Sequence, residues 1–350
     1  MTWQNYLDDQ QSKFVEDLLD FVRIPSVSAA KENFDDVVRA GNWVVSRLKQ
    51  AGIANARMMK TETHPIVYGD WLQAGSDKPT VLIYGHFDVQ PAEPLNLWDS
   101  PPFEPILVGG TIRGRGASDD KGGMLIPILA AEALLSSEGK LPVNVKFFFE
   151  GQEEIGSPTL QAFITDNSDL LKADMIFSAD GGQWGEDQPS MIMGLKGLVG
   201  CEIMVSGASG DQHSGMQGGG IANPIHALSH IIASMKDING EIKVTGFYDD
   251  VVELNVHDRQ SISRVPFDED SYIKKLGVPD VFGETGFTTP ERLWARPTLE
   301  LNGIWGGYQG EGTKTVLPAK AYAKITCRLV AGQKPDQIYM SVSYTHLRAH

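Results

Sequence analysis

The chain has 350 residues, of which 41% are hydrophobic and 21% charged, a composition that suits a globular protein of about two domains and excludes a disordered chain. Its net charge of −15 would repel phosphate and anionic lipid headgroups, so we expect neither nucleic-acid nor membrane-surface binding. The two cysteines, Cys201 and Cys327, lack the spacing of a zinc site and are too few for a disulfide framework. A polar, acidic start and no long apolar run in the sequence predict a cytoplasmic protein.

The first half of the chain alternates helical patterns with short apolar runs. A helix with one apolar face is expected to end before Pro25, and a second helix is expected from Asp35 to Gln50. A third helix is expected despite the proline at position 127 within it. Three continuous apolar runs predict strands that are buried on both faces. These strands cover residues 80–87, 143–151 and 174–180, and the third helix covers 122–139. The alternation predicts an α/β domain with a mostly parallel sheet and helices on both faces.

From residue 195 the pattern changes to alternating apolar and polar residues. Half-exposed strands are expected at 198–209 and 319–330, with a helix at 223–238 between them. Alternation is typical of an antiparallel sheet with helices on one face, which predicts an inserted α+β domain. The expected boundaries are 1–194 for the first domain, 195–342 for the second and 343–350 for a truncated or non-native tail. We therefore give His346 and His350 no role.

Polar clusters follow the predicted parallel strands, where ligands bind in open α/β sheets. His86 and Asp88 end the first strand, Glu153 and Glu154 follow the second, Asp180 follows the third, and Asp119 and Asp120 precede a helix. One histidine and several carboxylates form a mixed nitrogen and oxygen donor set that suits zinc or a similar divalent ion. A bound cation would also relieve the mutual repulsion of these carboxylates. The clusters together predict a metal site.

The spacing within the clusters suggests distinct tasks for neighbouring residues. Asp88 lies two residues after His86, on the same side of an extended segment, so it can accept the second imidazole N–H. Of the adjacent Glu153 and Glu154, one can hold a metal while the other accepts a proton from water. Each cluster alone has a simpler interpretation: a hydrogen-bonded structural histidine, a helix cap in residues 118–123, or a solvated loop. Their joint placement at strand ends favours the metal site.

Seven ordered motifs resemble those of the M20 family of di-zinc metallopeptidases, in its branch of cytosolic dipeptidases that includes the carnosine dipeptidases. The resemblance extends from the N-terminal region to about residue 340, and it implies zinc-dependent hydrolysis of dipeptides or short peptides. The motifs are YGHFDVQP, WDSPPFEP, GTIRGRGASDDKGG, EGQEEIGSP, DGGQW, HSGMQGG and KTVLPAKAYAKITCRLV.

The resemblance implies two zinc ions per subunit, with manganese or cobalt as alternatives. His86 and Asp180 would bind one ion, Asp119 would bridge both, and Glu154 would bind the second. Glu153 would be the general base and acid. The resemblance also implies a cis peptide bond after Asp119, between it and the next residue.

In the second domain, the resemblance implies a lid that also forms a homodimer. His213 would reach the active site of the partner subunit, and Thr315 and Arg328 would hold the carboxylate of the substrate. In the first domain, the resemblance implies that Asp88 orients His86. A surface salt bridge is the alternative interpretation of Arg328.

One departure from the family pattern concerns the end of the chain. The family takes a terminal histidine ligand of the second zinc from a catalytic segment that returns after the lid, and this chain stops before that segment. We therefore expect that these 350 residues alone form an incomplete first domain with an impaired second metal site and are inactive or poorly soluble, and that the activity belongs to the complete protein. Two other functions stay open: an M20-type amidohydrolase of N-acyl amino acids, and a noncatalytic metal-binding dimer.

Overall fold

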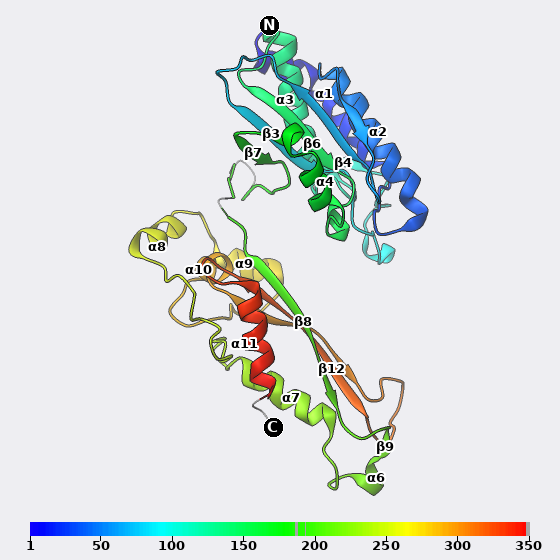
Figure 1. Cartoon of the computed structure of the whole chain (residues 1–350), viewed down its shortest axis with the longest axis vertical. Coiled ribbons are helices and arrows are strands. Elements are labelled where there is room, and N and C mark those ends of the chain that lie inside the picture. The colour runs from blue at the N-terminus through cyan, green and yellow to red at the C-terminus, as the bar shows by residue number, and fades with distance from the viewer. Residues whose placement is uncertain (186–187, 193, 348–350) are drawn as a thin grey trace. The chain divides into compact units, whose positions relative to one another are not determined.

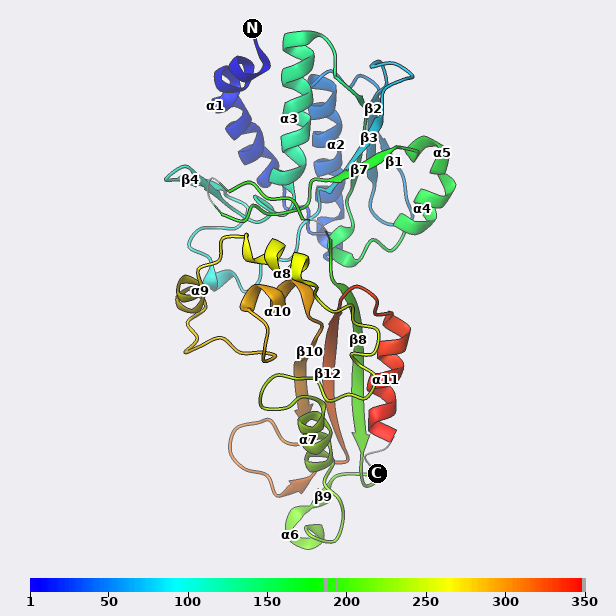
Figure 2. The ribbon, with the colours of Figure 1, turned by 90° about the vertical axis from the view of Figure 1, so that its left-hand side faces the viewer.

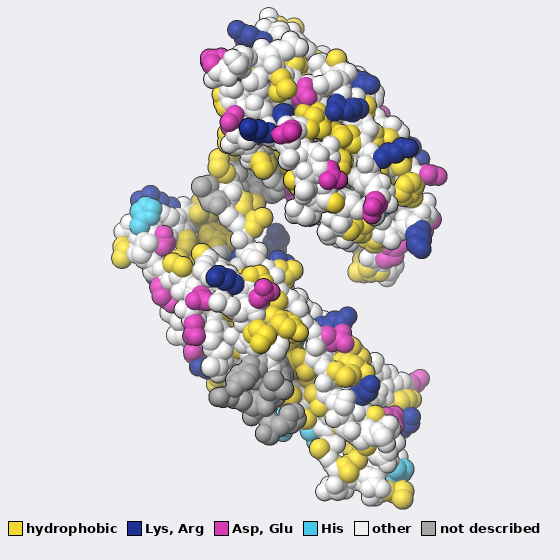
Figure 3. Space-filling model, viewed as in Figure 1, with side chains coloured by type: hydrophobic (Ala, Val, Ile, Leu, Met, Phe, Trp, Pro, Cys, Tyr) yellow, Lys and Arg dark blue, Asp and Glu magenta, His cyan; other side chains and the backbone are white. Residues whose placement is uncertain are grey.

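The computed structural model describes residues 1–185, 188–192 and 194–347, with side chains as far as residue 343. The chain divides into two compact units, Met1–Ile192 (unit 1) and Met193–His350 (unit 2) (Figure 1). On the face shown in Figure 3, positive and negative side chains are interspersed over both units. Of the expected tail, 343–350, the first residues belong to a helix, and His350 lies outside the described residues.

A five-stranded sheet of mixed direction forms the centre of unit 1, in the order β1-β2-β6-β3-β7. The strands are β1 (Arg57–Met59), β2 (Ile66–Trp71), β3 (Thr80–His86), β6 (Asn144–Glu150) and β7 (Met175–Ser178). β3 pairs in parallel with β6 and β7, whereas β2 is antiparallel to both β1 and β6. The three predicted strands are therefore confirmed as the parallel part of the sheet. The predicted burial of the third strand on both faces is wrong, because β7 lies at the edge of the sheet and is exposed along its length. The antiparallel β1 and β2 were not predicted.

Helices cover both faces of this sheet, as predicted (Figure 2). One face packs against α1 (Trp3–Val22), α2 (Phe34–Gln50) and α3 (Lys121–Glu138), and the other against α4 (Leu160–Asp166) and α5 (Ser168–Leu171). β6 is buried along its whole length because Phe147 and Phe149 join the first core while Phe148 stacks on Phe163 in the second. The α/β class of this unit is thus confirmed.

Short elements complete unit 1 around the ends of the parallel strands. A hairpin of β4 (Ile106–Val108) and β5 (Thr111–Arg113) precedes α3, and the 3₁₀ helices are η1 (Lys31–Asn33), η2 (Leu95–Leu97) and η3 (Glu153–Ile155). Helix α3 ends at Gly139, whose φ of 70° is the left-handed conformation that glycine adopts at helix ends. The element η3 follows β6 directly, so it lies at the carboxyl end of the parallel strands.

Unit 2 contains a three-stranded antiparallel sheet with the order β10-β12-β8. Its strands are β8 (Gly197–Ser206), β10 (Thr298–Gly306) and β12 (Lys320–Leu329), and one face packs against α7 (Pro224–Met235) and α11 (Pro335–Leu347). Alternate residues of β12 are buried under these helices: Ala321, Ala323, Ile325, Cys327 and Leu329. The predicted alternation and the one-sided packing are confirmed.

The remaining elements of unit 2 lie at the two ends of this sheet. One end carries the two-stranded pairing of β9 (Gln212–His213) with β11 (Val316–Leu317), followed by α6 (Ser214–Gln217). The others are α8 (Val256–Ser263), α9 (Glu269–Leu276) and α10 (Thr289–Ala295), of which α8 and α10 begin with capping boxes at Asn255 and Thr288. None of the helices in the described ranges has the length and apolarity needed to cross a bilayer.

Candidate active site

Four segments of unit 1 bring the predicted ligands to the carboxyl edge of the parallel strands. His86 is the last residue of β3, and Asp180 follows the end of β7 at Ser178. Asp119 precedes α3, and Glu154 lies in η3 directly after β6. Because β3, β6 and β7 run in parallel, these strand ends meet at one edge.

Three of the four predicted ligands form a compact group. The Nε2 atom of His86 lies 3.0 Å from Oδ1 of Asp119 and 3.9 Å from Oδ2 of Asp180. One ligand atom from each of these residues lies within 4.8 Å of the other two. His86 is fully buried, whereas both carboxylates are open to solvent. An imidazole nitrogen and two carboxylate oxygens at this spacing fit the first coordination shell of a divalent cation.

The electrostatics of His86 also fit a cation. Burial lowers the pKa of His86, but the carboxylates of Asp88, Asp120 and Asp119 outweigh burial and raise that pKa to about 10. The Nδ1 atom lies 3.1 Å from the backbone carbonyl of Asp88, which can only accept, so Nδ1 carries a proton. Nε2 then faces two carboxylates, an arrangement that needs a proton or a metal ion between them.

Asp88 makes more contacts than the sequence predicted. Its carboxylate lies 3.5 Å from Nδ1 of His86, so its own backbone carbonyl is the nearer acceptor for that ring. The two carboxylate oxygens accept the backbone N–H groups of Glu153 and Glu154, each at 3.1 Å. Asp88 is fully buried, and a buried carboxylate needs such donors. It therefore connects His86 to the η3 turn.

We predict that Asp88→Asn lowers metal affinity by roughly 10- to 100-fold, as loss of a group behind a metal ligand does elsewhere. An amide accepts only through its oxygen, so one of the two η3 N–H groups would lose its partner. Competition with a chromophoric chelator measures the affinity. Asp77→Asn, at an exposed site, is the matched control. Equal metal affinity in the two variants would refute a positioning role for Asp88.

The carboxylates of Glu153 and Glu154 lie in different surroundings. Glu154 accepts a hydrogen bond of 2.7 Å from Nε2 of Gln90, and it lies outside the group of three ligand atoms in the described part of the chain. Burial raises the pKa of Glu154, as does the charge of Asp119. Burial also raises the pKa of Glu153, followed by the charges of neighbouring carboxylates, while His86 opposes the shift. Gln90 is a contact that sequence reasoning missed.

Asp120 supports the same site from within the protein. The peptide bond between Asp119 and Asp120 is cis, as predicted. The Asp120 side chain is fully buried, and its Oδ2 accepts the backbone N–H of His86 at 3.1 Å. Burial raises the pKa of Asp120 to about 7. Although Asp120 is the N-cap residue of α3, its side chain makes no capping hydrogen bond, so the helix-cap interpretation of this residue is wrong.

The Asp120 side chain leaves room only for glycine at two neighbouring positions, and Lys121 next to it is buried. A Cβ atom at Gly85 would lie 2.6 Å from Oδ2 of Asp120, and one at Gly123 would lie 2.2 Å from Oδ1, so neither position has room for a side chain. Lys121 is fully buried and donates to the carbonyls of Phe21 and Ile24 at 3.0 and 2.6 Å. It ties the loop to the end of α1. In the sequence, Lys121 is the charged residue between Asp120 and Gly122, within the segment for which a helix cap was the alternative interpretation.

The predicted residues of unit 2 fall into two separate places. His213 and Thr315 are adjacent: Nε2 of His213 lies 3.2 Å from Oγ1 of Thr315, and Nδ1 accepts the N–H of Gly215 at 3.1 Å. Since Nδ1 accepts, the neutral ring carries its proton on Nε2. Arg328 lies near the other end of β12, opposite Leu198. The eight residue steps from Lys320, which pairs with Ser206, span about 26 Å at about 3.3 Å per residue.

The profile of the peptidase family M20/M25/M40 matches residues 82–328, which is more than two thirds of the chain and includes every predicted site residue. The chain belongs to peptidase family M20. The family resemblance and the predicted enzyme class, a metallopeptidase, are thereby confirmed.

Curated relatives of this M20 chain include two dipeptidases. The Cys-Gly metallodipeptidase dug1 of Schizosaccharomyces pombe is 34% identical over 349 residues, covering 95% of this chain and 72% of the relative. The Beta-Ala-His dipeptidase of Rattus norvegicus is 31% identical over 360 residues, covering 98% and 72%. This chain thus spans about 72% of the length of either relative.

Solved M20 structures have the same fold. The metallo-carboxypeptidase Sso-CP2 from Sulfolobus solfataricus has a TM-score of 0.84 and 33% identity, covering 96% of this chain and 75% of that one. Human carnosine dipeptidase 1 has a TM-score of 0.78 and 29% identity, covering 99% and 75%. The predicted fold class, an α/β domain with an α+β domain, is confirmed.

Proposed function

We propose that this M20 protein hydrolyses dipeptides or short peptides with two divalent cations bound in unit 1, zinc being the expected ion and manganese or cobalt the alternatives. The convergence of His86, Asp119 and Asp180 carries the proposal. The activities in the names of its relatives, Cys-Gly metallodipeptidase and Beta-Ala-His dipeptidase, support dipeptides as the substrate class. Unit 1 would be the catalytic domain.

The residues of unit 1 would divide the work of binding and proton transfer. His86 and Asp180 would hold one ion, Asp119 would bridge, and Glu154 would hold the second. Bound there, the ions would polarise the scissile carbonyl and lower the pKa of the attacking water. Glu153 would take a proton from that water and give it to the leaving amine nitrogen. A raised pKa suits this exchange, because a base of very low pKa would hold the proton too weakly.

The residues of unit 2 would bind the substrate across two subunits. The Nε2–H group of His213 would donate to the developing oxyanion, and Arg328 and Thr315 would hold the substrate carboxylate. A dipeptide spans about 7 Å, whereas the two ends of β12 lie about 26 Å apart along the sheet. The Arg328 of one subunit and the His213 of the same subunit would therefore not contact the same dipeptide. We therefore propose a homodimer through unit 2, acting as a lid. Each site would combine Arg328 of one subunit with His213 and Thr315 of the other.

We also propose that the enzyme works in the cytoplasm. Both cysteines, Cys201 and Cys327, are free thiols, which suits a reducing compartment. Fractionation of the source cells with a specific antibody would test this, and a secreted pool that carries the activity would contradict it.

Removal of metal by a chelator is expected to abolish hydrolysis of Cys-Gly and β-Ala-His, and added Zn²⁺ to restore it. Elemental analysis should find two ions per subunit in the active protein. His86→Gln is expected to lose bound metal, whereas His226→Gln, at an exposed position of α7, keeps it.

The substrate panel separates this proposal from its alternatives. Hydrolysis of N-acyl amino acids but not of dipeptides by the metal-loaded protein would identify an amidohydrolase. No hydrolysis of either class with two ions bound would favour the noncatalytic dimer.

A further inference from the structure

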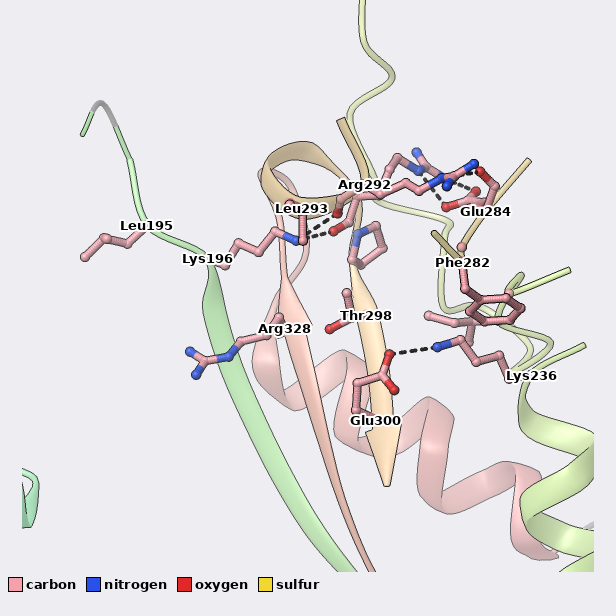
Figure 4. A pocket seen from close by; sticks show the side chains of 15 residues that line it. Leu195, Lys196, Lys236, Phe282, Glu284, Arg292, Leu293, Thr298, Glu300 and Arg328 are labelled. Carbon is pink, nitrogen blue, oxygen red and sulfur yellow. Dashed lines mark hydrogen bonds and ion pairs between the residues drawn. The ribbon is translucent and has the colours of Figure 1, made fainter. Parts of the chain in front are cut away.

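A pocket of about 620 Å³ lies in unit 2 at the end of the sheet that carries Arg328 (Figure 4). Five positively charged and two negatively charged side chains line it, so the lining has a surplus of three positive charges. The chain as a whole has a net charge of −15. A concentration of positive charge in so acidic a protein indicates a site for an anionic ligand.

Both carboxylates of the pocket are already neutralised. Lys236 pairs with Glu300 at 2.7 Å. Arg296 binds Glu284 with two hydrogen bonds of 2.6 and 2.9 Å, and Arg296 is itself only 5% exposed. These pairs hold the walls of the pocket in place and leave no free carboxylate for the other cations.

Three cations of the pocket have no carboxylate partner in the described part of the chain. Lys196 donates to the backbone carbonyls of Arg296 and Arg292 at 2.6 and 3.3 Å, and Arg292 donates to the backbone carbonyl of Glu284 at 3.0 Å. Arg328 is exposed, and its side chain makes no hydrogen bond or ion pair with any residue that the structure describes. In Figure 4, the Lys196 side chain points toward Leu293 and Arg292, whereas the Arg328 side chain points to the left, away from Glu284. Burial lowers the pKa of Lys196 to about 8, and the charge of Arg328 adds to this.

We propose that this pocket selects peptides whose C-terminal residue is acidic. The proposal rests on the function above, in which Arg328 holds the α-carboxylate of the substrate. The side-chain carboxylate of a C-terminal glutamate or aspartate would then lie against Lys196 and Arg292. It would supply the negative charge that these two cations lack, whereas a C-terminal lysine would add to the repulsion.

The test compares kcat/KM of the full chain for Ala-Glu, its neutral isostere Ala-Gln, and Ala-Lys. We expect a preference of about tenfold for Ala-Glu over Ala-Gln, and a still lower value for Ala-Lys. Arg292→Gln is expected to bring the ratio of Ala-Glu to Ala-Gln close to one, and Arg292→Lys to retain most of it. Arg264→Gln, an exposed arginine outside the pocket, is the matched control and keeps the preference.

A second measurement does not depend on turnover. Calorimetric titration with free L-glutamate and L-glutamine measures the same selectivity as binding, and Arg292→Gln should weaken glutamate alone. Equal values for the two ligands, or a preference that Arg292→Gln leaves unchanged, would overturn the proposal. If no peptide is hydrolysed, the proposed function fails, and the titration still decides whether the pocket selects an acidic residue.

Discussion

Replacement of Glu153 by glutamine is expected to lower kcat on a dipeptide by roughly 10²- to 10⁴-fold, the range by which a positioned general base contributes. The amide has nearly the same size as the carboxylate but cannot take a proton from water. Glu153 is the proposed base and is not one of the proposed metal ligands, so metal content should stay unchanged. Steady-state kinetics and elemental analysis of the same preparation measure both quantities.

The neighbouring Glu154 gives the matched contrast. Glu154→Gln is expected to lower metal affinity as well as activity, because Glu154 is the proposed ligand of the second ion. Glu62→Gln, in an exposed loop, serves as the neutral control. Loss of metal from the Glu153 variant, in step with its loss of activity, would contradict the assignment of Glu153 as the base. The shared hydrogen bonds to Asp88 make circular dichroism of both variants a necessary check on the η3 turn.

Joining two inactive subunits is expected to restore about half of the wild-type activity, since a symmetric dimer has two equivalent sites. One subunit carries Glu153→Gln and the other His213→Ala, each with its own affinity tag, and co-expression followed by two purification steps isolates the heterodimer. The Glu153→Gln subunit has no base in its own site. It can still donate its intact His213 to the site of its partner, where Glu153 is present. Each variant as a homodimer should be nearly inactive.

A second heterodimer tests whether the sharing is specific. Arg328 is proposed to serve the site of its own subunit, so pairing Glu153→Gln with Arg328→Ala leaves each site without one group. This heterodimer should stay inactive. Activity in this pair, or none in the His213 pair despite a dimeric mass by light scattering, would refute the shared site.

The sequence alone determined the parallel strands and the residues at their ends. The runs at β3 and β6 are apolar because both faces of these strands are covered, and β12 alternates because only one face is. The run at β7 is equally apolar, but this edge strand is exposed. These patterns depend on neighbours within a few residues. Since parallel strands end at one edge, the same patterns predicted that four ligands would meet there. His86, Asp119 and Asp180 form one group of ligand atoms, whereas Glu154 lies outside that group.

Only the tertiary structure decided which atoms meet. Asp88 binds backbone N–H groups 65 and 66 residues away in the chain, and Glu154 binds Gln90 across 64 residues, contacts that no local pattern encodes. The strands β1 and β2 were not predicted, and their antiparallel pairing joins β2 to a strand far along the chain, so the mixed direction of the sheet was not foreseen.

Local sequence patterns also do not encode the separation of His213 from Arg328 or the cationic pocket. Both depend on the pairing register of distant strands and on charges from widely spaced segments. Side-chain chemistry and periodicity are local properties of a sequence, whereas hydrogen-bond partners and the sum of charges around a pocket exist only once distant segments have packed together.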